Sequence, residues 1–470
     1  NTHNASLGPS TSQALAPGID GMGTCSDGLP CPPNTKKVYA GTLINAEVLG
    51  TVDVNRRFDV GLSAPVTLAL GAHIRGENYQ IQAGERASYV NGFHPTQWGR
   101  VAAAGSQVFP GWRPDDEVND WRTNLAFYAE AEANLHEDVL ANVAGRFENY
   151  SDFGSTVTGK VALRFQPVED LIIRGSASTG FRAPTQGQIH WKHISTGFQT
   201  TETGDQVAFE IGEFPVGAEE ARLLGARQLE EEKSVNLAGG IAVTPVNNLN
   251  ITVDGYWIDV TDAIVLSGTI QGDEVEVILE DFNATAIKYM TNAIDFTTKG
   301  LDITANYRWL LADEQLVEFD GAFNLNRVEV GGDQNLPQVL IDLGEQYLSP
   351  GEIDEIENEK PQEKFVGTAT YRWADFNARF QGQFFGGTRE LVNVNPDVPV
   401  DLSTKYVLNA SLGYEFDNGL RATVGMDNIT DEMPDLTPDG YNFLGIFPFA
   451  GRIVGVNGRR AYVNFRYSLR

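Results

Sequence analysis

The chain has 470 residues, a formal net charge of −29 and 41% hydrophobic residues, which suits either several soluble domains or one large all-β body. No stretch reaches the ~18 continuous apolar residues of a transmembrane helix, and the 10% of aromatic residues argues against a disordered chain. The acidic balance argues against nucleic-acid binding, which requires a basic face.

Apolar and polar residues alternate along many segments, which is the pattern of β-strands with two different faces. Taken in chain order, the alternation predicts about fifteen strands, the first near 46–59 and the last near 459–469. Three of the apolar faces, in chain order, consist of Val157, Val161, Leu163 and Phe165; of Leu301, Ile303, Ala305, Tyr307 and Trp309; and of Ala461, Val463, Phe465, Tyr467 and Leu469.

Three features favour a membrane barrel over a soluble β-sandwich, which also alternates. Aromatic residues stand at the ends of apolar faces, as at Tyr406 and Tyr414, like the girdles at bilayer interfaces. The polar faces carry charges in mid-strand, as the wall of a wet lumen would. Short turns alternate with long loops, which are expected at about 84–118, 182–230, 264–294, 331–361, 386–402 and 430–457. We therefore predict an all-β fold, a transmembrane antiparallel β-barrel.

One motif carries a family resemblance. The segment 171–184 reads Leu-Ile-Ile-Arg-Gly-Ser-Ala-Ser-Thr-Gly-Phe-Arg-Ala-Pro and resembles the strand and GFRAP sequence of TonB-dependent outer-membrane receptors. Segments 146–154, 428–434 and 458–467 resemble the same family in the same order. The resemblance implies a barrel of about 22 strands, about 15 of them in this chain, and a plug domain that is absent from this chain. The C-terminal portion of the barrel would then cover 1–470, with an extracellular loop over 1–40 and strands, long extracellular loops and short periplasmic turns over 41–470.

The resemblance also implies a function. A multi-pass protein of the bacterial outer membrane would import a scarce nutrient (siderophore-bound iron, cobalamin, an oligosaccharide or a peptide) with energy from the inner-membrane TonB complex. Its partners would be that complex, reached through the N-terminal plug, the remaining barrel strands, outer-membrane lipid and lipopolysaccharide, and a surface lipoprotein. A passive porin-like channel is the alternative. We find no nucleophile elbow, phosphate loop or catalytic acid pair, so neither an enzyme nor a resident cofactor is expected.

Two segments are candidates for the mouth of the barrel. The GFRAP segment either forms part of the mouth or serves the architecture, with glycine and proline setting the exit of the chain and an arginine pairing in the wall; we favour the second interpretation. Its residues are Gly180, Phe181, Arg182, Ala183 and Pro184. Further along, the spacing of His190 and His193 could suit a metal ion, but ligand capture by His190, Trp191 and Phe198 is the better hypothesis.

The two cysteines, the acidic runs and the lumen arginines are the remaining candidates for structural or binding roles. Cys25 and Cys31 could be free thiols or metal ligands, although a small disulfide in an extracellular loop is favoured by the oxidising compartment. The acidic runs 114–117, 230–232 and 351–363 are expected to be solvated loop faces, with calcium bound between loops as an alternative. We expect the lumen arginines to pair with carboxylates of the wall and the plug; they are Arg164, Arg174, Arg308, Arg372, Arg379, Arg421 and Arg466.

Overall fold

The computed structural model describes residues 2–6, 24–31, 37–92, 104–106, 109–200, 206–280, 284–312, 314–332, 334–394, 397–438, 448–451 and 453–468. Most of them belong to one sixteen-stranded sheet. Its strands are β1 (Thr2–Ser6), β2 (Lys37–Phe58), β3 (Val66–Gln82), β4 (Val118–His136), β5 (Val139–Tyr150), β6 (Gly154–Val168), β7 (Leu171–Arg182), β10 (Glu232–Val246), β11 (Leu249–Leu266), β14 (Met290–Ala312), β15 (Gln315–Gly331), β16 (Glu363–Trp373), β17 (Phe376–Phe385), β20 (Lys405–Glu415), β21 (Leu420–Asp427) and β24 (Arg460–Tyr467).

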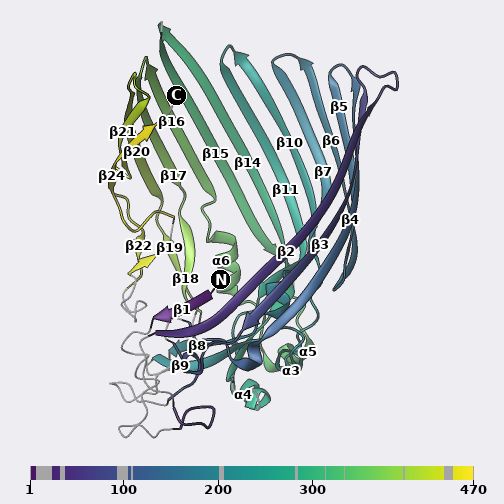
Figure 1. Ribbon diagram of the computed structural model, residues 1–470, viewed down its shortest axis with the longest axis vertical. Helices are drawn as coiled ribbons and strands as arrows, with labels where there is room; N and C mark the ends of the chain where they lie inside the picture. The colour runs from purple at the N-terminus through teal and green to yellow at the C-terminus, as the bar shows by residue number, and fades with distance from the viewer. Residues whose placement is uncertain are drawn as a thin grey trace.

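Each of these strands pairs with the next in the order just given, from β1 at one edge to β24 at the other. Neighbouring strands run antiparallel, as in β2 with β3 or β21 with β24. Figure 1 shows the strands tilted side by side in a curved wall, with β24 on the left and β2 crossing the view from lower left to upper right. The prediction of an all-β, antiparallel sheet is confirmed, and fifteen strands longer than β1 make up this wall.

The wall has two chemically different faces. Val463 stands opposite Val424 and Phe465 opposite Ala422, whereas Asn464 stands opposite Thr423 on the other face. The same alternation runs along β6, where the apolar series 157–165 is largely exposed. Exposed apolar side chains on one face suit contact with lipid, and the polar face suits a lumen.

The first long strand begins earlier than the alternation predicted. β2 starts at Lys37 rather than near residue 46. Val38 and Ala40, two residues apart on one face of this strand, are both buried, and Val38 packs with Cys25 and Val90. In this part of β2 the apolar face is therefore covered by the connections instead of being exposed as on a lipid-facing strand.

The connections differ in length between the two ends of the wall. One end carries short turns, such as 416–419 between β20 and β21; we call it the turn end. The long connections gather at the other, the loop end, which is the lower end in Figure 1. They contain η1 (Arg86–Ser88), η2 (Pro114–Asp116), α2 (Gln186–His190), β8 (His193–Thr200), β9 (Gln206–Glu213), α3 (Glu219–Leu223), β12 (Ile270–Gln271), α4 (Asp273–Leu279), β13 (Ala286–Lys288), α5 (Gln338–Leu343), α6 (Pro350–Asn358), β18 (Thr388–Val394), β19 (Asp397–Leu402), β22 (Asp435–Leu436) and β23 (Phe449–Ala450).

Three of the long connections share one hydrophobic core. Leu224 follows α3, Leu279 ends α4, and Leu340 lies in α5; all three are fully buried together with Tyr289. We call this cluster the loop core. The segments that the sequence marked only as long loops are thus packed elements. No helix in the described part of the chain has both the length and the apolar character that crossing a bilayer would require.

Candidate functional site at the loop end

The GFRAP segment forms the end of β7 and the start of the connection that follows. The Arg182 guanidinium forms an ion pair with the Glu232 carboxylate of the neighbouring strand β10. Glu232 also accepts a hydrogen bond of 2.7 Å from the Ile264 N–H. Arg182 is therefore engaged in the wall, and its carboxylate partner joins three segments of the chain.

A buried arginine holds the chain where it leaves β7. Arg122 on β4 is 5% exposed and donates a hydrogen bond of 2.6 Å to the carbonyl oxygen of Pro184. Its guanidinium also contacts Glu77 at 2.7 Å and Asp152 at 3.4 Å, and it lies over the ring of Tyr150. The sequence offered no signal for Arg122, because its partners come from three separate segments.

His190 ends the short helix α2 and is tied to the wall. The helix begins with reciprocal hydrogen bonds between Thr185 and Gln188, a capping box. The His190 Nε2 atom lies 2.9 Å from the Asp120 carboxylate, and its ring stacks on Tyr79. Burial lowers the pKa of His190 and outweighs the nearby carboxylate, so the ring is neutral at pH 7 and donates a hydrogen bond to Asp120.

Trp191 and His193 belong to an aromatic layer inside the connections. Trp191 Nε1 donates a hydrogen bond of 2.6 Å to Glu213, and its ring meets Trp112 edge to face. The buried His193 places Nε2 at 2.8 Å from the Pro110 carbonyl oxygen. Trp191 Nε1 and His193 Nε2 are therefore both engaged in hydrogen bonds within the connections. Phe198 lies on β8, but its side chain is outside the described residues.

Cys25 and Cys31 form a disulfide in the structure, with their Cα atoms 5.0 Å apart. The small loop that it closes is held by Arg86, which contacts the Asp27 carboxylate through Nε at 2.5 Å and Nη2 at 2.6 Å. Arg86 lowers the pKa of Asp27 to about 2. The disulfide and this bidentate pair brace the loop against η1.

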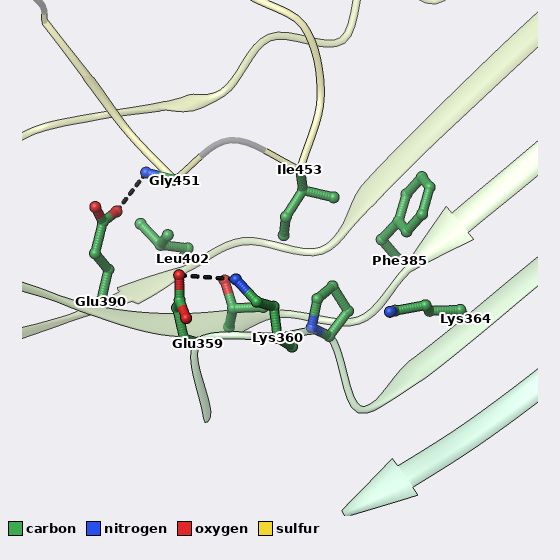
Figure 2. Close-up of a pocket in the computed structure, with 10 residues that line it drawn as sticks. Glu359, Lys360, Lys364, Phe385, Glu390, Leu402, Gly451 and Ile453 are labelled. Atoms are coloured by element: carbon green, nitrogen blue, oxygen red, sulfur yellow. Dashed lines mark hydrogen bonds and ion pairs between the residues drawn. The ribbon is translucent and has the colours of Figure 1, made fainter. Parts of the chain in front are cut away.

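One hollow at the loop end lies against the last strands of the wall. This vestibule cavity has a volume of about 480 Å³. Figure 2 shows Lys364 and Phe385 entering it from one side and Glu390 and Gly451 from the opposite side. Lys364 on β16 and Phe385 on β17 are register partners on the polar, lumen-side face. The lining is Glu359, Lys360, Pro361, Lys364, Phe385, Thr388, Glu390, Leu402, Gly451 and Ile453.

Ion pairs hold the hairpin that forms one side of the vestibule cavity. Arg389 on β18 contacts Asp401 of β19 at 2.7 Å and Asp354 of α6 at 2.9 Å. Beside it, Glu390 accepts a hydrogen bond from the Gly451 N–H. Gly451 has φ +67°, and a Cβ there would lie 2.6 Å from Leu402, so this contact requires glycine. The sequence did not predict the cavity, since its lining comes from several connections without a motif.

The acidic runs are only in part the solvated loop faces that their composition predicted: Asp115, Glu117, Glu230 and Glu359 are exposed, but other members are buried or lie in regular elements. Asp116 is buried and accepts a hydrogen bond of 2.8 Å from the Arg113 N–H, and burial raises the pKa of Asp116. Glu232 lies in β10, and residues 350–358 form α6. These carboxylates have internal partners because the connections pack against one another. In the described ranges, no group of three or more His, Cys, Asp or Glu side chains could hold a metal ion; loop-bound calcium stays a prediction.

The sheet is a long antiparallel wall with one face suited to lipid and one suited to a lumen. It has short turns at one end and packed connections with a cavity at the loop end. Together these features define the class of outer-membrane barrels. The family model described as "TonB dependent receptor-like, beta-barrel" matches residues 32–429. The chain belongs to this family of TonB-dependent receptor barrels, as its GFRAP segment predicted.

Solved structures share the fold at low sequence identity. The siderophore receptor PirA from Acinetobacter baumannii is 13% identical, with a TM-score of 0.60, over 94% of this chain and 57% of that one. A variant of the ferric enterobactin receptor PfeA from Pseudomonas aeruginosa, in complex with enterobactin, is 15% identical, with a TM-score of 0.60, over 99% of this chain and 58% of that one. The chain thus spans less than two thirds of either receptor. No curated protein matches it in sequence.

Proposed function

We propose that the protein takes part in TonB-dependent import of a scarce nutrient across the bacterial outer membrane, as a multi-pass barrel. The observation that carries the proposal is the vestibule cavity, which opens on the lumen-side face of a barrel wall that belongs to this family. A ligand held there lies at the entrance of the lumen. The TonB complex of the inner membrane and a plug in the lumen are the proposed partners for the energised step.

The choice of first ligand follows from the relatives. PirA is described as a siderophore receptor and PfeA as a ferric enterobactin receptor, and both share the fold of this chain. Ferric siderophores are therefore the first class to test, with cobalamin, oligosaccharides and peptides next. The cavity suits a ligand with both a polar and a ring-like surface, since Lys364 and Phe385 stand side by side in it.

The test replaces one wall residue of the cavity. Cells that depend on this protein are given labelled ferric siderophores, ferric enterobactin first, and initial uptake is measured. Lys364→Ala is expected to lower uptake about tenfold, because it removes one hydrogen bond to a charged group, which contributes ~1.5 kcal/mol. Lys160→Ala is the matched control, because Lys160 lies on the lumen-side face of β6 and does not line the cavity.

Two results would contradict the proposal. Equal uptake by the Lys364→Ala and Lys160→Ala variants, for every ligand class that the unsubstituted protein takes up, would show that the cavity does not contribute to uptake. Uptake at a full rate in cells without TonB would favour the passive porin-like channel instead.

A further inference from the structure

The lipid-side face of the wall, opposite its lumen-side face, is hollowed across four neighbouring strands. The floor of the hollow is a row of small residues that are direct register partners: Ala305 on β14, Gly321 on β15, Gly367 on β16 and Gly382 on β17. We call this row the outer trough. The cavity over Ala305, Gly321 and Gly367 has a volume of about 390 Å³. Figure 1 shows the four strands side by side in the wall.

Bulky side chains border the outer trough on all sides. The rows next to it on the same face, one toward the turn end and one toward the loop end, are mainly aromatic. Their aromatic residues are Tyr307, Phe319, Phe323, Phe365, Phe380 and Phe384. Ile251 on β11 and Leu408 on β20 close the two ends of the row. Phe319, Phe365 and Phe380 are about half exposed, so their rings stand out from the wall as ridges.

The position of the outer trough along the strands places it in one leaflet. Trp309 and Tyr371 share a row on the same face, closer to the turn end, and such residues concentrate at bilayer interfaces. The trough lies roughly 10 Å from this row along the membrane normal, at ~3.3 Å per residue and a strand tilt of ~40°. This is less than half of the ~25 Å apolar band of such barrels. The trough therefore faces the hydrocarbon of the leaflet on the turn-end side.

The width and depth of the outer trough determine what can fill it. The two ridges are roughly 13 Å apart between backbones, and their rings leave less room than the ~10 Å diameter of a helix. An extended peptide would leave backbone N–H and C=O groups unpaired in hydrocarbon. A hydrocarbon chain has neither difficulty. We propose that the outer trough holds one acyl chain of a phospholipid from the leaflet on the turn-end side, as a resident lipid.

This inference differs from the general contact of the outer face with lipid. A chain on a flat part of the wall contacts protein on one side, whereas a chain in the trough contacts the floor and both ridges. The larger apolar area removed from its surroundings favours retention of that lipid over exchange. The inference concerns the outer face alone, so it does not rest on the proposed function, which is tested by uptake.

Photo-cross-linking in intact outer membranes tests the inference. Cells that produce the protein are grown with a fatty acid that carries a diazirine, which they build into their phospholipids, and are then irradiated. Mass spectrometry of the digest locates each adduct and identifies the lipid from its mass. Phe319 borders the trough and Phe165 lies on the lipid-side face of β6, and both are 43% exposed. We expect about tenfold more phospholipid adduct at Phe319, which corresponds to a preference of ~1.4 kcal/mol.

Gly321→Leu fills the outer trough. A Cβ at Gly321 has its nearest neighbour, the Ala305 carbonyl oxygen, at 3.9 Å, so the added side chain fits without moving the wall. The adduct at Phe319 should then fall to the level at Phe165. Gly159→Leu is the matched control, because Gly159 lies on the lipid-side face of β6 and also has room for a Cβ. It should leave the excess at Phe319 unchanged.

The adduct at Phe165 in each sample shows that the wall is folded in the membrane. Equal adduct at Phe319 and Phe165 in the unsubstituted protein would overturn the inference, as would an excess that survives Gly321→Leu. Less adduct at Phe319 than at Phe165 would also overturn it, because a second copy or another protein would then cover the trough. So would an excess whose mass is not that of a phospholipid.

Discussion

Side-chain direction on β24 determines what each residue contacts. Val463 shares the apolar face with Val424, and Asn464 shares the polar face with Thr423. Val463→Arg should therefore lower the free energy of unfolding by about 2–4 kcal/mol, the cost of an arginine on the lipid face near the midplane. The measurement is urea-induced unfolding in phospholipid vesicles. Asn464→Arg is the control and should have a much smaller effect; equal losses would mean that the faces are assigned wrongly.

The pairing of Asp27 with Arg86 makes the disulfide loop sensitive to acid. The folded pKa of Asp27 is about 2, below the value near 3.9 of an unpaired aspartate. The pair is therefore fully stabilising above pH 4 and is lost as the pH falls toward 2. We expect a phosphine reagent to reduce the Cys25–Cys31 bond faster as the pH falls through this range. Asp27→Asn should abolish this acid step, and an unchanged pH profile in that variant would disprove the role of the pair.

At the scale of elements, the loop core stabilises the long connections by burying their apolar side chains. In α5, Leu340 is fully buried and its neighbour Ile341 is 54% exposed. Leu340→Ala should destabilise α5 by about 2–5 kcal/mol because it leaves a cavity, whereas Ile341→Ala should stay within about 0.5 kcal/mol. Hydrogen exchange of the α5 amides measures both. Similar exchange in the two variants would show that the connection does not pack as a unit.

Arg122 joins β4 to the segment that leaves β7. Arg122→Ala removes the cation between Glu77 and Asp152 and leaves the Pro184 carbonyl without its donor. We expect a loss of about 3–5 kcal/mol, typical of breaking a buried ion pair, and faster proteolysis at α2. Arg57→Ala, at an exposed position of β2, is the control for the removal of an arginine. If cleavage at α2 is equally slow in both variants, Arg122 does not hold this segment.

At the scale of the whole molecule, the sequence predicts the wall far better than the rim. Alternation depends on local contacts with lipid and lumen, so the faces of β6, β14 and β24 could be predicted from the residues alone, as could the family from its GFRAP segment. The burial of Leu279 and Leu340 depends on contacts between separate connections, which leave no periodic signal. The vestibule cavity was missed for the same reason, because Lys364, Glu390 and Gly451 meet only after folding.

TonB-dependent import requires energy coupling, and uptake measurements can detect it. Initial uptake of the labelled ligand is measured in cells that produce the protein, before and after the proton-motive force is dissipated, and in cells that lack TonB. We expect that the ligand still binds at the cell surface in both cases, while its accumulation inside falls to the level of cells without the protein. Accumulation that continues at an unchanged rate under both conditions would contradict TonB-dependent import by this barrel.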